Sequence, residues 1–341
     1  MGVSMDQVML GPELLAEAEA RAEDLIAWRR EFHQFPELAF EENITASRVS
    51  QTLASFPGVE VVTGFGVPTA VLGVLRGDLP GPAVALRAEM DALALEEETG
   101  LSFASCIPGV MHACGHDAHM AALLGCASLL SQRAESLTRP VVFVFQPAEE
   151  GKGGAKALVE AGLLDRFRIE HVLGVLLWPQ LPYGHLRTRK GVLTALSDRM
   201  HIEIQGVGGH AASPHATVDP VVVAAHVILG MQSLISREID PLESAVISFG
   251  QVEAGYAYNI IPEQAHLWGT LRAFETPVRD YLQERIETLV PALAKAYRAR
   301  ASMEYVRNYP QVFNDGEFTD RVLEAALPFF GEDAVGTLDR P

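Results

Sequence analysis

Short apolar segments that alternate with helical patterns constrain the fold of this chain more than any other feature of its sequence. Gly and Pro bound three such segments, which is typical of strands buried on both faces; they lie at residues 70–75, 83–90 and 141–145. Helical periodicity occurs before and between them, at residues 11–34, 120–134 and 156–161. The alternation predicts an α/β domain with a mostly parallel sheet.

The pattern changes near Leu193. Period-two segments joined by Gly-rich turns now dominate; they read MHIEIQGVGG, AVISFGQVEAG and QAHLWGTLRAF. Helical patterns at residues 219–239 and 276–300 lie among them, and a further one follows at 317–330. We therefore expect residues 1–192 and 309–341 to form one domain, and residues 193–308 to form a smaller inserted α+β domain.

The charge balance argues against several classes of partner. The chain has 26 Lys and Arg against 44 Asp and Glu, a net charge of −18, so it lacks the basic clusters that bind nucleic acid. No segment of about 20 uninterrupted apolar residues predicts a membrane span, and the first residues do not resemble a signal peptide. We expect a cytoplasmic protein in a reducing compartment, with Cys106 and Cys126 as small buried hydrophobes.

The densest concentration of chemical groups is the segment MHACGHDAH at residues 111–119. It places five potential metal ligands within eight positions. Thiol and imidazole groups this close, with Gly115 allowing a tight turn before a helix, suit a transition metal. A cluster of hydrogen-bonded histidines at a helix start is the alternative interpretation.

Carboxylates follow two of the predicted strands. Glu149 and Glu150 come shortly after the strand at 141–145. Glu89 lies at the end of the strand at 83–90, and Asp91 directly follows that strand. Ligands of open α/β sheets bind beyond the carboxyl ends of the strands, so we expect these groups to converge with the 111–119 segment. A solvated acidic turn is the alternative for the Glu-Glu pair.

The inserted region contributes three further candidates. His210 lies in a Gly-rich turn, whereas Asn259 and Arg272 lie on strand-like segments. Each residue alone also fits an ordinary turn or strand, but together they could supply an oxyanion donor and a clamp for a substrate carboxylate.

The order of motifs resembles a known enzyme family. The motifs are RREFHQFPELAFEE, LRAEMDAL, GVMHACGHDAHMAALLG, FVFQPAEEGKGGAKALVEAGLL, GGHAASPHATVDP, NIIP and GTLRAF. Together they resemble the amidohydrolase branch of the dinuclear metallopeptidase family, from about Arg29 to about Asn314. That branch includes hippurate hydrolases, N-acyl-amino-acid amidohydrolases and plant-type hydrolases of indole-acetic acid conjugates.

The resemblance implies a catalytic domain of zinc-peptidase type that binds two divalent metals (Zn, Mn, Co or Ni), and a lid domain that makes a homodimer contact. By position, it makes Cys114, His116 and Glu150 metal ligands. Asp91 matches a carboxylate that orients a neighbouring ligand.

The resemblance also implies hydrolysis of N-acyl amino acids to a carboxylic acid and an amino acid. Glu149 takes the place of the general base, and His210 that of a lid residue reaching toward the scissile carbonyl. Asn259 and Arg272 take the places of residues that hold the substrate.

The sequence departs from the family pattern at the metal site. Leu176 stands where relatives usually have a metal-binding His, with His171 and His185 as nearby candidate substitutes, and Glu89 stands where Asp is usual. Relatives also continue beyond the last residue here to a final His ligand. We therefore expect at most one firmly bound metal and weakened activity. The alternative is a catalytically inactive relative that acts as a binding or scaffold protein.

Overall fold

The computed structural model describes the backbone of residues 5–339 and the side chains of residues 12–339. Contacts within the chain divide it into two compact units. The first comprises Met1–His185 and Pro328–Gly331, and the second comprises Leu186–Leu327 and Glu332–Pro341. The domain boundaries expected at residues 193 and 308 stay a prediction.

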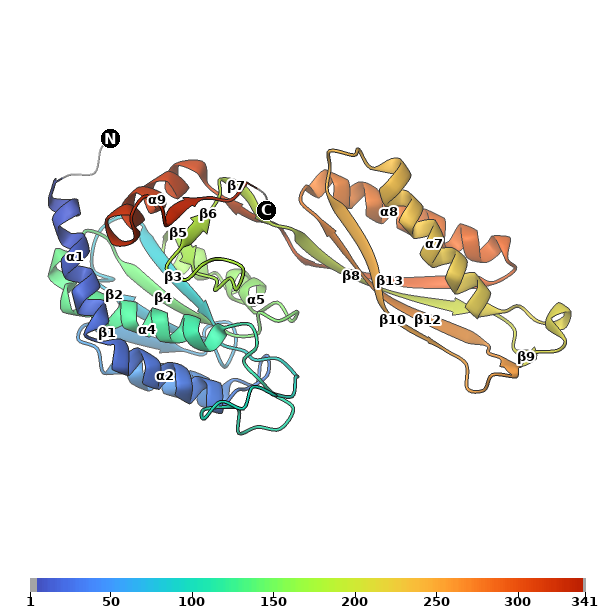
Figure 1. The fold of residues 1–341 in the computed structure, drawn as a ribbon, viewed down its shortest axis with the longest axis horizontal. Coiled ribbons are helices and arrows are strands. Elements are labelled where there is room, and N and C mark those ends of the chain that lie inside the picture. The colour runs from blue at the N-terminus through green and yellow to red at the C-terminus, as the bar shows by residue number, and fades with distance from the viewer. Residues whose placement is uncertain (1–4, 340–341) are drawn as a thin grey trace. The chain divides into compact units, whose positions relative to one another are not determined.

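The first unit is built on a five-stranded sheet in the order β1-β2-β4-β3-β5 (Figure 1). Its strands are β1 (Val59–Thr63), β2 (Val71–Leu75), β3 (Ala83–Glu89), β4 (Val141–Gln146) and β5 (Ile169–Gly174). Strands β4, β3 and β5 are parallel, whereas β1 and β2 are antiparallel to their neighbours. The α/β fold class is confirmed, and the sheet is mixed because the short connection between β1 and β2 permits only antiparallel pairing.

Six helices accompany this sheet in the described residues. They are α1 (Met5–Glu19), α2 (Ala22–Gln34), α3 (Asn43–Ala54), α4 (His116–Gln132), α5 (Gly154–Glu160) and α6 (Leu163–Arg166), with a 3₁₀ turn at Ala134–Ser136. The single helix expected over residues 11–34 is wrong, since it is two helices interrupted at Ala20 and Arg21. The Arg21 guanidinium donates to the carbonyl of Glu17 at 2.7 Å, which satisfies an acceptor at the end of α1.

Strand β4 shows how the core of the first unit is layered. All six of its residues are buried. Phe143 and Phe145 pack with residues of α2, α3 and α4 on one face, while Val142 and Val144 pack with residues of α5 and α6 on the other. Helices therefore cover both faces of the sheet, as the unbroken apolar run of β4 predicts.

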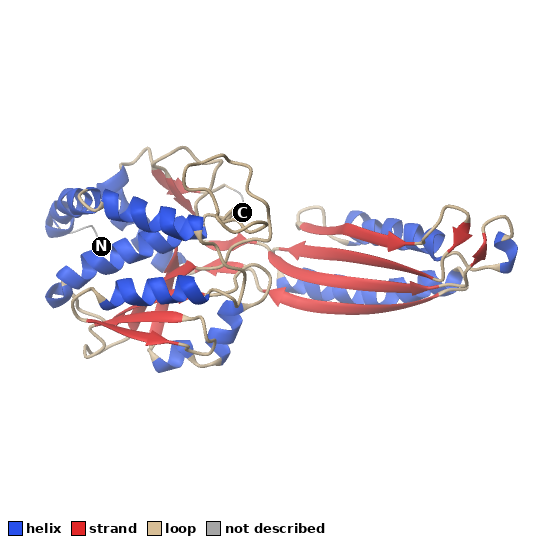
Figure 2. Ribbon diagram, turned by 90° about the horizontal axis from the view of Figure 1, so that it is seen from below, coloured by secondary structure: helices blue, strands red, loops and turns tan. Residues whose placement is uncertain are grey.

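The second unit contains a four-stranded antiparallel sheet in the order β10-β12-β8-β13. These strands are β8 (Leu196–Gln205), β10 (Ala245–Ala254), β12 (Gln264–Ala273) and β13 (Arg300–Tyr309). Helices α7 (Pro220–Glu238) and α8 (Thr276–Ala296) lie together on one face of the sheet (Figure 2). An antiparallel sheet covered by two helices confirms the α+β fold expected for this second part of the chain.

Shorter elements complete the second unit. They are β6 (Leu186–Thr188), β7 (Gly191–Thr194), β9 (Gly209–His210), the 3₁₀ turn Pro214–Ala216, β11 (Ile260–Ile261), β14 (Val312–Asn314), α9 (Gly316–Phe330) and β15 (Val335–Thr337). The last residues of α9, from Pro328, belong to the first unit. The helix expected over 276–300 ends early, at Ala296, and Arg300 already begins β13. Arg298 has a left-handed backbone (φ 67), a conformation that stops a helix.

Helix α7 is, by length and composition, one candidate for a membrane-spanning segment among the described residues. Its side chains Val223, Val227, Met231 and Leu234 are buried in the core against the four-stranded sheet. This packing explains the apolar composition of α7 as that of a helix covering a sheet.

Two cysteines differ from expectation. Cys106 and Cys126 are exposed rather than buried. Cys106 lies in a loop before α4, and Cys126 lies on α4 at the same helical face as Ala122, which is also exposed. Local sequence does not reveal which face of a helix is turned away from the sheet.

Candidate metal centre and catalytic site

The candidate metal ligands gather where α4 begins. Gly115 occupies the N-cap position of α4 with a left-handed backbone (φ 81), a conformation that glycine adopts without strain. The turn lies between Cys114 and His116. Ligand atoms of Cys114, His116 and Glu150 lie within 4.8 Å of one another. The structure thus brings together the three residues expected to bind metal.

Hydrogen bonding fixes which nitrogen of His116 is available. Its Nδ1 lies 2.7 Å from the backbone oxygen of Asp91 and 3.6 Å from Asp91 Oδ1, so Nδ1 carries the proton. Its Nε2 lies 4.0 Å from Glu150 Oε1. A backbone acceptor on one imidazole nitrogen is the usual support for a metal ligand on the other.

The groups around His116 favour the binding of a cation. Burial alone would lower the pKa of His116, but its contacts with Asp91 and Cys114 and the charge of Glu89 raise it to about 11. A pKa raised against the effect of burial requires negative charge from nearby groups. Thiolate, imidazole and carboxylate donors in such a setting fit a divalent transition metal.

A second set of candidate ligands, Glu89, His116 and His119, is buried beside the first. His119 Nδ1 donates to Glu89 Oε2 at 2.9 Å, and His119 Nε2 accepts the amide of Leu177 at 3.0 Å. Glu89 also pairs with Arg87, and its pKa is lowered to about 2 because these hydrogen-bond and charge partners outweigh its burial. Both ring nitrogens of His119 are therefore already engaged.

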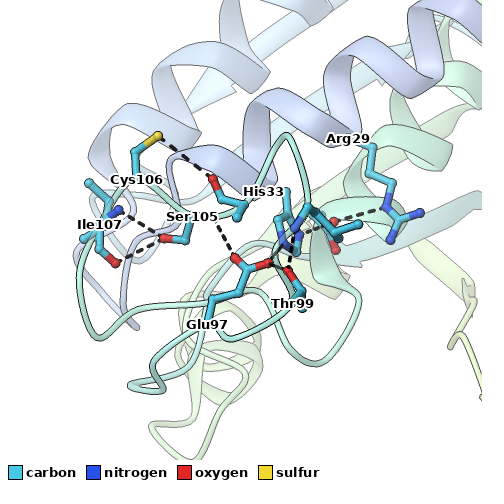
Figure 3. A network of polar contacts seen from close by, with 10 residues as sticks. Arg29, His33, Glu97, Thr99, Ser105, Cys106 and Ile107 are labelled. Atoms are coloured by element: carbon cyan, nitrogen blue, oxygen red, sulfur yellow. Dashed lines mark hydrogen bonds and ion pairs between the residues drawn. The ribbon is translucent and has the colours of Figure 1, made fainter.

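The remaining two polar residues of the 111–119 segment are Asp117 and His112. Asp117 Oδ2 accepts from His33 Nδ1 at 2.9 Å and from Arg29 at 3.2 Å, and His33 Nε2 lies 3.2 Å from Glu97 (Figure 3). His112 is buried, and burial lowers its pKa to about 4. In the described part of the chain, neither ring nitrogen of His112 has a hydrogen-bond partner.

The adjacent carboxylates of the Glu-Glu pair are fixed through their backbones. The amides of Glu149 and Glu150 each donate to an oxygen of Asp91 at 2.9 Å. Burial raises the pKa of Glu149, and the neighbouring charge of Glu150 raises it further. Asp91, expected to orient a ligand, thus contacts His116 as well as both glutamates.

Three other candidates lie in the second unit. His210 on β9 pairs with Ile260 on β11, and the carbonyl of Asn259 accepts the amide of Ala211 at 3.2 Å. Arg272 lies on β12, where its guanidinium contacts Thr270. The backbone pairing keeps His210 and Asn259 close together within this unit.

Leu176, expected to replace a metal-binding histidine, follows β5 and is 48% exposed. The next residue, Leu177, is tied to the site through the bond to His119. His119 was among the five potential ligands of the 111–119 segment, but its bonds to Glu89 and Leu177 were not predicted from the sequence. The signal was present, because His119 lies one helical turn after His116 and on the same side of α4.

Comparison with known proteins identifies the family. The model of the peptidase family M20/M25/M40 matches residues 85–341. The N-acyl-L-amino acid amidohydrolase of Geobacillus stearothermophilus is 41% identical over 295 residues, covering 86% of this chain and 79% of that protein. The chain belongs to the M20 peptidase family.

Two further M20 relatives support the same branch. The N-acetylcysteine deacetylase of Bacillus subtilis (strain 168) is 40% identical over 302 residues, covering 89% of this chain and 79% of the relative. The crystal structure of the Bacillus subtilis YXEP protein, described as a dinuclear metal-binding peptidase of the M20 family, has a TM-score of 0.77 and 34% identity. The matched region covers 95% of this chain and 83% of the YXEP chain. This M20 chain is a metallo-amidohydrolase acting on amide bonds, and the resemblance seen in the sequence is confirmed.

Proposed function

We propose that this metallo-amidohydrolase cleaves N-acyl amino acids to a carboxylic acid and an amino acid. The observation that carries the proposal is the position of Glu149. Its backbone is held by Asp91 beside Glu150, which belongs to the group of three candidate metal ligands. The printed activities of the relatives, N-acyl amino acid hydrolysis and N-acetylcysteine deacetylation, support this substrate class.

In this proposal, Cys114, His116 and Glu150 hold a divalent metal such as Zn, Mn, Co or Ni. When bound, such a metal polarises a carbonyl and lowers the pKa of water toward neutrality. Glu149 accepts the proton of the attacking water and passes it to the leaving amine. Its raised pKa suits a group that must take up and release a proton in turn.

The second unit supplies the other proposed groups. His210 donates to the developing oxyanion of the scissile carbonyl. Asn259 and Arg272 hold the substrate carboxylate, for which a guanidinium is the best-matched side chain. Both assignments rest on the family motifs that these residues match.

We propose at most one firmly bound metal per chain. Leu176 cannot coordinate, and His119 is occupied by Glu89 and Leu177. A second buried cation without enough donors would be costly. Hydrolysis is accordingly expected to be weak.

We also propose a cytoplasmic homodimer that contacts neither nucleic acid nor membranes. Strand β10 is an edge of its sheet, and its Val246 and Val252 are 52% and 55% exposed. An edge strand with exposed apolar side chains is suited to pairing with a second copy.

Metal content per chain, measured beside hydrolysis of N-acetyl, N-benzoyl and N-indoleacetyl amino acids, tests the proposal. We expect close to one metal and slow turnover of at least one compound. The double variant C114A/H116A should lose both the bound metal and the turnover, because it removes two of the three metal donors. Metal-free wild-type protein without turnover would favour the inactive binding protein instead.

A further inference from the structure

The backbone amides of three successive residues, Ala148, Glu149 and Glu150, each donate a hydrogen bond to a buried carboxylate. The amide of Ala148 donates to Glu42 Oε1 at 2.8 Å. The next two amides donate to Asp91, as described above. The loop that carries Glu149 and Glu150 is therefore held from two sides, by Glu42 and by Asp91.

Glu42 is unusual for a carboxylate. It is fully buried, and its other oxygen accepts the hydroxyl of Thr69 at 2.8 Å. Burial raises the pKa of Glu42, and hydrogen bonds to Thr69 and to backbone amides partly offset that effect. Among the described ion pairs, none involves Glu42. Burying a carboxylate without a cation is costly. An apolar residue would avoid this cost, but it could not accept the hydrogen bonds from Ala148 and Thr69.

The residue that Glu42 holds has a strained backbone. Ala148 is buried and has φ 54, in the left-handed region that non-glycine residues rarely adopt. Its carbonyl accepts the amide of Gly154 at 2.9 Å, so both polar groups of its backbone are fixed. Relaxation of Ala148 to an ordinary conformation would rotate the chain that follows, and with it the side chains of Glu149 and Glu150.

We propose that Glu42 is a positioning residue: its bond to the Ala148 amide keeps the loop in the strained conformation that sets Glu149 as base and Glu150 as metal ligand. The catalytic part of this inference rests on the proposed function. The structural part does not, since it concerns the loop itself. Strain at a functional loop persists only where surrounding contacts determine the conformation, and Glu42 is such a contact.

Hydrogen–deuterium exchange of peptides covering residues 147–154 tests the structural part in the full-length protein. We compare wild type with E42A, E42Q and the control E41A, since Glu41 is the exposed neighbour in the same segment. Losing a hydrogen bond to a charged acceptor should speed exchange in this loop by on the order of ten- to a hundredfold in E42A. E42Q keeps an acceptor oxygen and should recover part of the protection, while E41A should match wild type.

The catalytic part is tested on the substrate that wild type turns over best. E42A should lower kcat with little change in KM, and E42Q should restore part of kcat. A purely structural role would give no such recovery and would instead lower the unfolding temperature in step with activity. Unchanged exchange in the 147–154 loop of E42A would overturn the inference. Should E42A not fold, E42M decides, because Met fills the buried site without an acceptor, and exchange equal to wild type in E42M contradicts the proposal.

Failure of the two proposals can be told apart. If wild type hydrolyses none of the N-acyl amino acids, the proposed function fails, whereas the exchange comparison still decides the role of Glu42.

Discussion

At the scale of single residues, carboxylates of the same chemical kind have different tasks around the metal centre. Glu89 is paired with Arg87 and His119, and its pKa is lowered to about 2. Burial raises the pKa of Asp91, but its hydrogen bond with His116 and the backbone amides that it accepts lower it overall. Glu149 instead has a pKa raised by burial and by Glu150. Environment rather than residue type separates a structural carboxylate from a candidate base.

Replacement of Glu149 by Gln tests this separation. The amide keeps the shape but cannot accept the proton, so kcat should fall by roughly 10²–10⁴-fold. Metal content should stay at the wild-type value, because Cys114, His116 and Glu150 are untouched. Steady-state kinetics beside metal analysis measure both quantities, and comparable turnover in wild type and E149Q would place the base elsewhere.

Replacement of Leu176 by His tests the proposed loss of a metal ligand. If this position corresponds to a ligand of relatives, L176H should raise the metal content above one per chain and increase hydrolysis. L176Q, which is similar in size but a poor metal ligand, is the control. A wild-type chain that already holds two metals and turns over substrate briskly would refute the assignment around Leu176.

At the scale of elements, the start of α5 packs closely against the end of the loop that carries the glutamates. A Cβ atom added to Gly154 would lie 1.7 Å from the carbonyl oxygen of Pro147. Only glycine therefore allows the first turn of α5 to approach the loop. The requirement is steric, since Gly154 does not have a positive φ.

We expect G154A to destabilise the protein. Alanine would gain about 1 kcal/mol of helix propensity, but the clash with backbone atoms should outweigh it and leave a net loss of about 1–3 kcal/mol. Denaturant unfolding measures the change. G250A is the matched control, since a Cβ at Gly250 meets nothing within 4 Å. Equal stability of G154A and wild type would mean that α5 can shift without cost.

At the scale of the whole molecule, the proposed homodimer depends on the free edge of the four-stranded sheet. The exposed valines of β10 make the free edge of that sheet the expected contact. Sedimentation should give a dimer for wild type and a monomer for V246K/V252K, because two buried lysines without partners would oppose association. S302K on the opposite edge strand, β13, should remain dimeric, and a wild-type monomer would contradict the proposal.

Features that depend on local patterns could be predicted from the amino-acid sequence. Apolar runs bounded by Gly and Pro located β2, β3 and β4 almost to the residue, and the helical pattern at residues 219–239 located α7 to within one residue at each end. The metal candidates Cys114 and His116 were also predictable, because they are two positions apart across a glycine. Glu150 joins them because β3 and β4 are adjacent parallel strands, so the segments that follow them lie at one edge of the sheet.

Partners that are far apart in the sequence became known only from the folded chain. Glu42 and Ala148 are 106 positions apart, and His119 and Leu177 are 58 apart. The break between α1 and α2, the antiparallel direction of β1 and β2, and the exposure of Cys126 likewise depend on what packs against each element. Periodicity records which face of an element is apolar, but a hydrogen bond between distant segments leaves no local pattern. Its partners become known only when the chain is folded and their desolvated polar groups must be satisfied.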